Sequence, residues 1–286
     1  MIKKPKVLVL RTAGTNCNEE TAFAFSRCGG DVEQVHVNAL VSRTRKLSDY
    51  HILALPGGFS YGDDIASGRI LANELRLKLG DDLQRFIADG KLVIGICNGF
   101  QVLVKAGILP GPDPQEDLSS RQSGTRDAAA LRQQATLFNN DSAKFEARWT
   151  HLTVGGKSVW TKGMSGRIDL PVAHGEGKFI PASGNVLQLL KKNSQIVFRY
   201  CAADGGKPFD KAQGKPGYPD NPNGSVEDIA GICDTTGRVL GLMPHPERHF
   251  FAIQHPSWTR RPQTSEFGDG AKIFENGVNY VRSRLL

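Results

Sequence analysis

The chain has 286 residues, enough to bury a substantial core in one large domain or two modest ones. Its apolar fraction of 39% and charged fraction of 23% are typical of a globular protein and exclude a mainly disordered chain. The net charge of +7 is spread along the whole sequence, with no basic run interleaved with aromatic residues, so nucleic-acid binding is not indicated. A phosphorylated substrate, an acidic partner or a basic surface without function would each fit that charge.

The N-terminal sequence and the cysteines indicate a cytoplasmic protein. The apolar run VLVL at residues 7–10 is shorter than the ~7 to 15 residues of a signal-peptide core, and no segment has the length of a membrane span. The cysteines are odd in number, scattered and without a CxxC pair, which favours neither a disulfide framework nor a zinc site. They are Cys17, Cys28, Cys97, Cys201 and Cys233.

The first 107 residues predict alternating strands and helices. Strands are expected at 6–10, 31–37, 51–56 and 91–96, and helices at 15–30, 67–88 and 98–107. For the first helix, Asn16 or Asn18 is the expected N-cap and Gly29 the expected end. This alternation predicts an α/β fold with a mostly parallel, flavodoxin-like sheet and helices on both faces.

The rest of the chain carries two loops between strand-like stretches. A polar insertion at about 110–135 and a Gly/Pro-rich loop at about 205–224 are expected at the surface of a single domain, 1–286. A β-hairpin is expected at 229–244, turning at Asp234 to Gly237, and a helix at Ala271 to Arg284. The other strand-like stretches are 145–154, 156–160, 172–179 and 195–201.

Cys97 stands where a strand turns sharply into a helix. It follows the strand at 91–96 and precedes a helix beginning at Asn98, so the helix dipole favours the thiolate. Gly95 and Gly99 leave room for close packing and for a substrate, as in the G-x-S-x-G elbow of hydrolases. The alternative is a cysteine that only fills the core.

A base and its orienting carboxylate are available in GLMPHPER, residues 241–248. His245 follows a predicted strand and Glu247 lies two residues on, so both can emerge at one strand end. The imidazole would accept the thiol proton and pass it to a leaving nitrogen, while the carboxylate holds its tautomer. The pair therefore supports Cys97 as a nucleophile.

Hydrogen-bond donors for a reacting carbonyl are expected in LPGGFSYGDD, residues 55–64. Gly57 and Gly58 follow a buried strand and let the backbone turn, so that an N–H near Gly58 or Phe59 points at the carbonyl oxygen. The N–H of Asn98 would be the second donor of this oxyanion hole.

The pattern G-x-C-x-G-x-Q (residues 95–101), the PGG loop and the His-Pro-Glu stretch resemble the class I, or triad-type, glutamine amidotransferases. Six stretches in order resemble, within that class, the glutaminase subunits of phosphoribosylformylglycinamidine synthases. They are GTNC (14–17), PGGFSYGD (56–63), GICNGFQ (95–101), HGEGKF (174–179), NPNGS (221–225) and GRVLGLMPHPER (237–248).

The resemblance implies that Cys97 attacks the side-chain amide of L-glutamine to form a thioester, with His245 and Glu247 completing the triad. Gln101 and the PGG loop would help to bind glutamine. The ammonia would pass to a synthetase subunit that converts formylglycinamide ribonucleotide to formylglycinamidine ribonucleotide with ATP, in purine biosynthesis. ATP and Mg²⁺ would bind to that partner and no cofactor to this chain; a small accessory subunit would complete the complex. The insertion at 110–135 is longer than the short form of this subunit has, so contacts made there by relatives do not carry over.

Two other functions stay open from the residues alone: a cysteine hydrolase of another substrate on the same fold, and a non-catalytic subunit that binds a partner. GGKS at 155–158 is expected to be a turn in a hairpin rather than a phosphate-binding loop, because His151 stands where that loop needs glycine. The spacing of His245, His249 and His255 matches no usual metal-ligand set.

Overall fold

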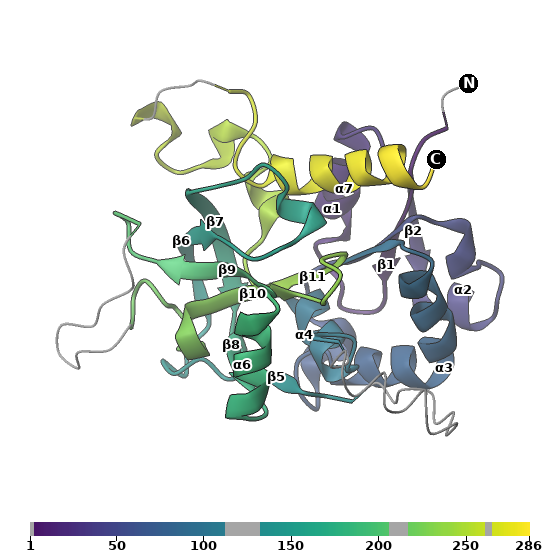
Figure 1. Cartoon of the computed structure of the whole chain (residues 1–286), viewed down its shortest axis with the longest axis horizontal. Helices are drawn as coiled ribbons and strands as arrows, with labels where there is room; N and C mark the ends of the chain where they lie inside the picture. The colour runs from purple at the N-terminus through teal and green to yellow at the C-terminus, as the bar shows by residue number, and fades with distance from the viewer. Residues whose placement is uncertain (1–2, 112–131, 206–216, 261–264) are drawn as a thin grey trace.

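The computed structural model describes residues 3–111, 132–205, 217–260 and 265–286 (Figure 1). Its centre is a nine-stranded sheet with the order β2-β1-β3-β4-β11-β10-β9-β6-β7. The strands from β2 to β11 are parallel neighbours, and those from β11 to β7 are antiparallel neighbours. The bounds are β1 Lys6–Arg11, β2 Asp31–His36, β3 Ile52–Leu55, β4 Leu92–Ile96, β6 Glu146–Val154, β7 Arg167–His174, β9 Ile196–Cys201, β10 Ile229–Cys233 and β11 Val239–Leu242.

Helices cover both faces of the parallel half, which confirms the predicted fold class (Figure 1). Helices α1 (Asn18–Arg27) and α7 (Ala271–Arg284) contact each other on one face. Helices α3 (Arg69–Ala88) and α4 (Asn98–Lys105) pack together on the other, with α4 against β3, β4 and β11. Within the described ranges, no helix is both long and apolar enough to cross a membrane.

The central strands are apolar because the sheet is covered on both sides. Every residue of β3, β4, β10 and β11 is buried. Near-continuous apolar runs of this kind are typical of parallel strands between two helical layers. The ends of β3, β4 and β11 therefore have a rigid support.

The first helix begins differently from the prediction. Cys17 stands at the N-cap of α1 and makes no side-chain cap, so neither Asn16 nor Asn18 caps the helix. Asn18 is instead the first helical residue, and its amide donates to the Gln34 side chain at 2.7 Å.

The predicted hairpin around GGKS is wrong, although the turn is present. After β6 the chain turns at Gly155 into a short 3-10 helix, Val159–Thr161, and β6 pairs with β7 instead. The reason is Trp160, which is fully buried and donates its indole N–H to the Arg238 carbonyl at 2.8 Å. A buried indole with a bonded N–H cannot lie on a two-stranded surface ribbon.

Some elements after residue 110 differ in their bounds from the prediction, and two helices of the chain were not predicted. The stretch 172–179 divides at Gly175 into β7 and β8 (Lys178–Pro181), and β8 pairs with β5 (Ala135–Phe138) in a second sheet. Helices α2 (Val37–Val41) and α6 (Gly184–Lys192) were not predicted. The hairpin of β10 and β11 and the helix α7 are confirmed.

The two predicted loops lie partly outside the described residues, which omit 112–131 and 206–216. The end of the second loop is buried rather than exposed: Asn221 and Asn223 are each less than 5% exposed. The single-domain organisation of 1–286 stays a prediction.

Candidate active site

The elbow at Cys97 is held by a backbone hydrogen bond to β11 and by close packing against β3. Cys97 lies between β4 and α4 with φ 51° and ψ −106°, a sparsely populated conformation for a residue with a side chain. Its N–H donates to the Leu242 carbonyl at 2.8 Å, at the end of β11. A Cβ on Gly99 would lie 1.9 Å from the Leu55 carbonyl oxygen, so only glycine lets α4 approach β3 this closely.

His245 and Glu247 form a buried pair beside this elbow. The backbone N–H of His245 donates to the Pro171 carbonyl at 2.8 Å, and the ring nitrogen Nδ1 of His245 lies 2.6 Å from Glu247 Oε1. His245 Nε2 is buried without a hydrogen-bond partner among the described residues. Burial alone would lower the pKa of His245, but the Glu247 carboxylate and the Cys97 sulfur outweigh it and raise the pKa well above its ordinary value. The free nitrogen therefore belongs to an imidazole that readily takes a proton.

At Gly57 the loop that follows β3 packs against Cys97, at the end of β4, and against His245, which follows β11. A Cβ placed on Gly57 would lie 2.7 Å from His245 Cε1, 3.1 Å from Cys17 Sγ and 3.4 Å from Cys97 Cβ. The ends of β3, β4 and β11 thus converge, as the sequence predicts for strands that end at one edge of a parallel half-sheet.

Of the N–H groups predicted as oxyanion donors, one already has a hydrogen-bond acceptor within the protein. The Phe59 N–H donates to the Gly14 carbonyl at 2.8 Å, so it is already used in this structure. The Gly58 N–H has no partner in the described part of the chain, and the backbone there has φ 138°. Asn98 occupies the first position of α4, where an N–H has no intrahelical acceptor. Among the described residues the Gly58 and Asn98 N–H groups are therefore available, and their role as oxyanion donors stays a prediction.

Gln101 lies in the same region, but its amide is engaged by protein groups. The residue is buried; its Nε2 donates to the Glu176 carbonyl and its Oε1 accepts from Asn98 Nδ2 at 3.0 Å. Its direct role in binding glutamine stays a prediction.

Residues 4–281 match the model of the CobB/CobQ-like glutamine amidotransferase domain. The chain belongs to this family. It is 46% identical to the phosphoribosylformylglycinamidine synthase subunit PurQ of Dehalococcoides mccartyi, over 98% of this chain and 99% of that one. It is 42% identical to the same-named subunit of Methanococcus maripaludis, over 96% of this chain and 97% of that one.

Solved structures agree with this membership. The chain matches a chain in the structure of PurLQS from Thermotoga maritima with a TM-score of 0.68 and 28% identity, over 98% of this chain and 100% of that one. A glutamine amidotransferase from the same organism matches with a TM-score of 0.51 and 14% identity, over 99% of each chain, which shows the fold alone.

In this amidotransferase a second cysteine, whose position the sequence did not reveal, lies beside His245. Cys17 Sγ lies 3.9 Å from His245 Nδ1 and accepts a hydrogen bond from Arg248 at 3.0 Å. Burial raises the pKa of Cys17, which keeps it a thiol. The sequence signal was the motif GTNC, but nothing in it indicated proximity to His245.

Metal binding is not favoured at this point of the amidotransferase. The ligand atoms of Cys17, His245 and Glu247 lie within 4.8 Å of one another. The guanidinium of Arg248 beside that sulfur opposes a cation, however, and His245 Nδ1 is already bonded to Glu247. His249 and His255, the other two histidines considered, pack their rings against Trp149.

His174 is a second residue near His245 for which the sequence assigned no role. Asn140 Oδ1 accepts from the Gly177 N–H and lies 3.2 Å from His174 Nδ1, so that nitrogen carries the proton. His174 Nε2 is buried with no hydrogen-bond partner within the described ranges. Burial, with the nearby His245 acting in the same direction, lowers the pKa of His174 to about 3.

The depressed pKa of His174 predicts a loss of stability in mild acid. The unfolded chain binds a proton at this residue below its ordinary pKa of about 6.5, whereas the folded chain does not until about pH 3. Stability is therefore complete above pH 6.5 and falls as the pH drops, by about 2 kcal/mol between pH 7 and pH 5 from this residue. Denaturant unfolding of the wild type and of His174→Gln at a series of pH values measures the difference. Parallel curves for the two proteins would contradict the prediction.

Proposed function

We propose that this amidotransferase is the glutaminase subunit of a phosphoribosylformylglycinamidine synthase. It hydrolyses L-glutamine and delivers the ammonia to a synthetase subunit, which converts formylglycinamide ribonucleotide to formylglycinamidine ribonucleotide with ATP. The observation that carries the proposal is the full-length identity of 46% to a relative with that name, together with the elbow at Cys97 beside His245 and Glu247. A hydrolase of another substrate and a non-catalytic subunit are not favoured, because neither accounts for both observations.

In the proposed reaction Cys97 is the nucleophile. His245 Nε2 takes the thiol proton, and the sulfur attacks the side-chain amide carbon of glutamine. The N–H groups of Gly58 and Asn98 stabilise the negative oxygen that forms. His245 then gives its proton to the amide nitrogen, the C–N bond breaks and ammonia leaves.

The resulting glutamyl thioester on Cys97 is cleaved by water. His245 Nε2 takes a proton from the water, its oxygen attacks the thioester carbon, and the sulfur leaves with the proton as a thiol. The net change is glutamine plus water to glutamate plus ammonia. Glu247 keeps the Nδ1–H of His245 oriented toward itself throughout.

The ATP-dependent step belongs, in this proposal, to other chains of a cytoplasmic complex. Replacing an amide oxygen with ammonia needs an activated oxygen, and the GGKS stretch of this chain is a turn without the phosphate-loop pattern. ATP and Mg²⁺ are therefore assigned to the synthetase subunit. The relative from Thermotoga maritima was solved as PurLQS, which supports a synthetase and a small third subunit as partners.

The isolated chain should hydrolyse glutamine poorly. The loop that carries Gly58 exposes Phe59 and Ile65, at 44% and 73%, so a docked partner can press on it directly. Adding the synthetase subunit, nucleotide and acceptor should raise glutaminase turnover at least about tenfold, within the usual range of coupling between sites. Glutamate release is measured for the chain alone and for the complete mixture. Equal turnover in both would show that the site is complete without a partner.

A further inference from the structure

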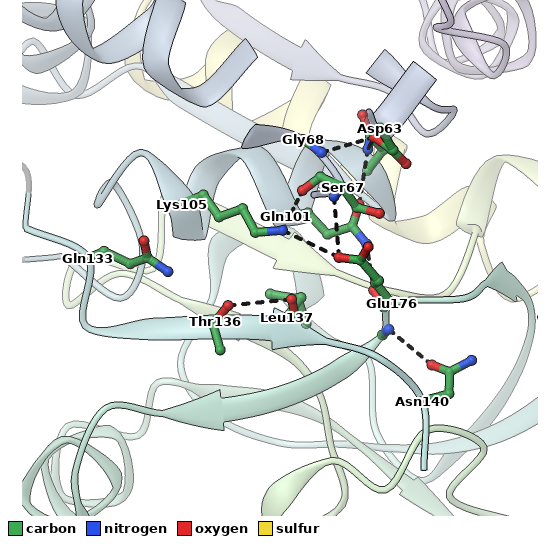
Figure 2. Close-up of polar contacts among 12 residues, drawn as sticks. Asp63, Ser67, Gly68, Gln101, Lys105, Gln133, Thr136, Leu137, Asn140 and Glu176 are labelled. Atoms are coloured by element: carbon green, nitrogen blue, oxygen red, sulfur yellow. Dashed lines mark hydrogen bonds and ion pairs between the residues drawn. The ribbon is translucent and has the colours of Figure 1, made fainter. Parts of the chain in front are cut away.

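Lys105 is a buried charge that the proposed reaction does not use. It is the last residue of α4, and its side chain is only 4% exposed. Its Nζ donates to the Ser67 carbonyl at 2.5 Å and lies 3.6 Å from Glu176 Oε2 (Figure 2). Glu176 belongs to the motif HGEGKF, which also has no part in the triad.

The contacts of Glu176 reach the residue next to the nucleophile. Its backbone carbonyl accepts from Gln101 Nε2, and Gln101 Oε1 accepts from Asn98 Nδ2 at 3.0 Å. Asn98 directly follows Cys97 and supplies one of the proposed oxyanion donors. The elbow helix and the turn after β7 are thus joined by side chains one helical turn apart.

A second path returns from Asn98 to Glu176 through the glycine loop. Asn98 Nδ2 also donates to Asp63 Oδ1 at 3.1 Å, and the same oxygen accepts from the Gly68 N–H at 3.0 Å. The N–H of Ser67, the neighbour of Gly68, donates to Glu176 Oε2 at 3.2 Å. The contacts therefore close into a loop ring, of which Figure 2 shows the Gly68–Asp63 and Ser67–Glu176 contacts. It consists of Asp63, Ser67, Gly68, Asn98, Gln101 and Glu176.

The glycine loop that this ring fixes contains residues with unfavourable backbone dihedral angles. Tyr61 and Asp63 have φ of 55°, in the left-handed region that residues with side chains avoid. Each such residue costs about 1–3 kcal/mol and persists only where contacts from the surrounding structure fix it. Asn98 Oδ1 supplies one more fixing contact, accepting the Ser60 N–H at 3.2 Å.

Stability alone does not explain the Lys105 and Glu176 pair. Burial lowers the pKa of Lys105, with Glu176 acting in the opposite direction, so the charge is retained against a desolvation cost. Replacing a buried ion pair with apolar groups is often neutral or stabilising, so such a pair is weak evidence for stability. In some proteins it instead specifies one arrangement of the packed elements. Here that arrangement is the position of the glycine loop relative to α4.

We propose that Lys105 and Glu176 are positioning residues of the glutaminase: their ion pair holds the Glu176 carboxylate in the loop ring, and the ring holds the Gly58 N–H and the Asn98 N–H toward one oxyanion. The inference rests on the proposed function. It concerns the rate of the chemical steps rather than the affinity for glutamine, because both residues act through the backbone of the loop.

The test uses Lys105→Met, Glu176→Gln and the double variant in the assembled complex. Each single change should lower kcat for glutamine about 10- to 100-fold, the cost of misplacing an oxyanion donor, while KM changes by less than about threefold. The double variant should lose no more than the worse single variant, because both break one contact. Lys272→Met is the matched control: it removes a lysine paired with Glu275 on α7, with both side chains about half exposed.

Further measurements separate positioning from folding and from the proposed function. Synthesis from added ammonium salt should stay at the wild-type rate in all variants, and the Cys97 thioester, trapped and measured by mass, should form more slowly. Glutamine use by the wild type tests the proposed function separately. Turnover within twofold of the wild type, a change confined to KM, or an equal loss of ammonium-dependent synthesis would each overturn the positioning role.

Discussion

Cys97→Ala is expected to abolish glutamine-dependent synthesis in the assembled complex while leaving synthesis from ammonium salts intact. The alanine removes the sulfur that forms the thioester, and no other described residue presents a thiol at the elbow between β4 and α4. The synthetase chemistry needs only ammonia, so it continues when ammonia is supplied directly. Product formation with glutamine and with ammonium chloride measures the two routes.

Cys17→Ala is the matched control for this experiment. Cys17 is the other buried cysteine beside His245, and its sulfur is engaged by Arg248. Its removal should leave the thioester on Cys97 detectable by mass measurement. Glutamine use that survived in Cys97→Ala but not in Cys17→Ala would transfer the nucleophile to Cys17 and refute the assignment.

Gly57→Ala is expected to lower glutamine turnover about 100-fold or more without unfolding the chain, because small displacements of reacting groups have effects of this size. The added Cβ would lie 2.7 Å from His245 Cε1, closer than carbon atoms approach, so the imidazole or the loop must move. Either movement separates the base, the nucleophile and the Gly58 N–H. Turnover and thermal unfolding are measured together.

Gly80→Ala provides the matched glycine control. Gly80 lies inside α3, and a Cβ there meets no atom within 4 Å. The change should leave turnover unaffected and stabilise the helix by about 0.5–1 kcal/mol. Wild-type turnover in Gly57→Ala would mean that the loop tolerates displacement and that its position is not what limits the reaction.

The parallel half of the fold could be predicted from sequence because each of its signals is local. Strand β4 is a short apolar run followed by glycine-flanked Cys97, and α3 carries buried leucines at helical spacing. The positions of Cys97, His245 and Gly57 at strand ends follow from the rule that parallel strands end at one edge. Their convergence could therefore be expected from the sequence alone.

The remaining parts depend on contacts between distant segments. The short 3-10 helix after β6 forms because Trp160 finds the Arg238 carbonyl, a partner 78 residues away. The position of Cys17 beside His245 likewise depends on the packing of the Gly57 loop between them. A single sequence gives no sign of such pairings, since periodicity and turn residues report only on near neighbours. The loop ring and the ion pair of Lys105 with Glu176 could not be predicted for the same reason.

The strand order also determines when the site can exist during synthesis. Strand β11, which leads to His245, lies between β4 and β10, although β4 belongs to the first third of the sequence and β11 to the last fifth. In a growing chain β4, which leads to Cys97, is therefore an edge strand until β11 has been synthesised. Non-local strand pairing of this kind is slow. A ribosome-bound chain that lacks β11 and His245 is thus expected to be inert toward glutamine.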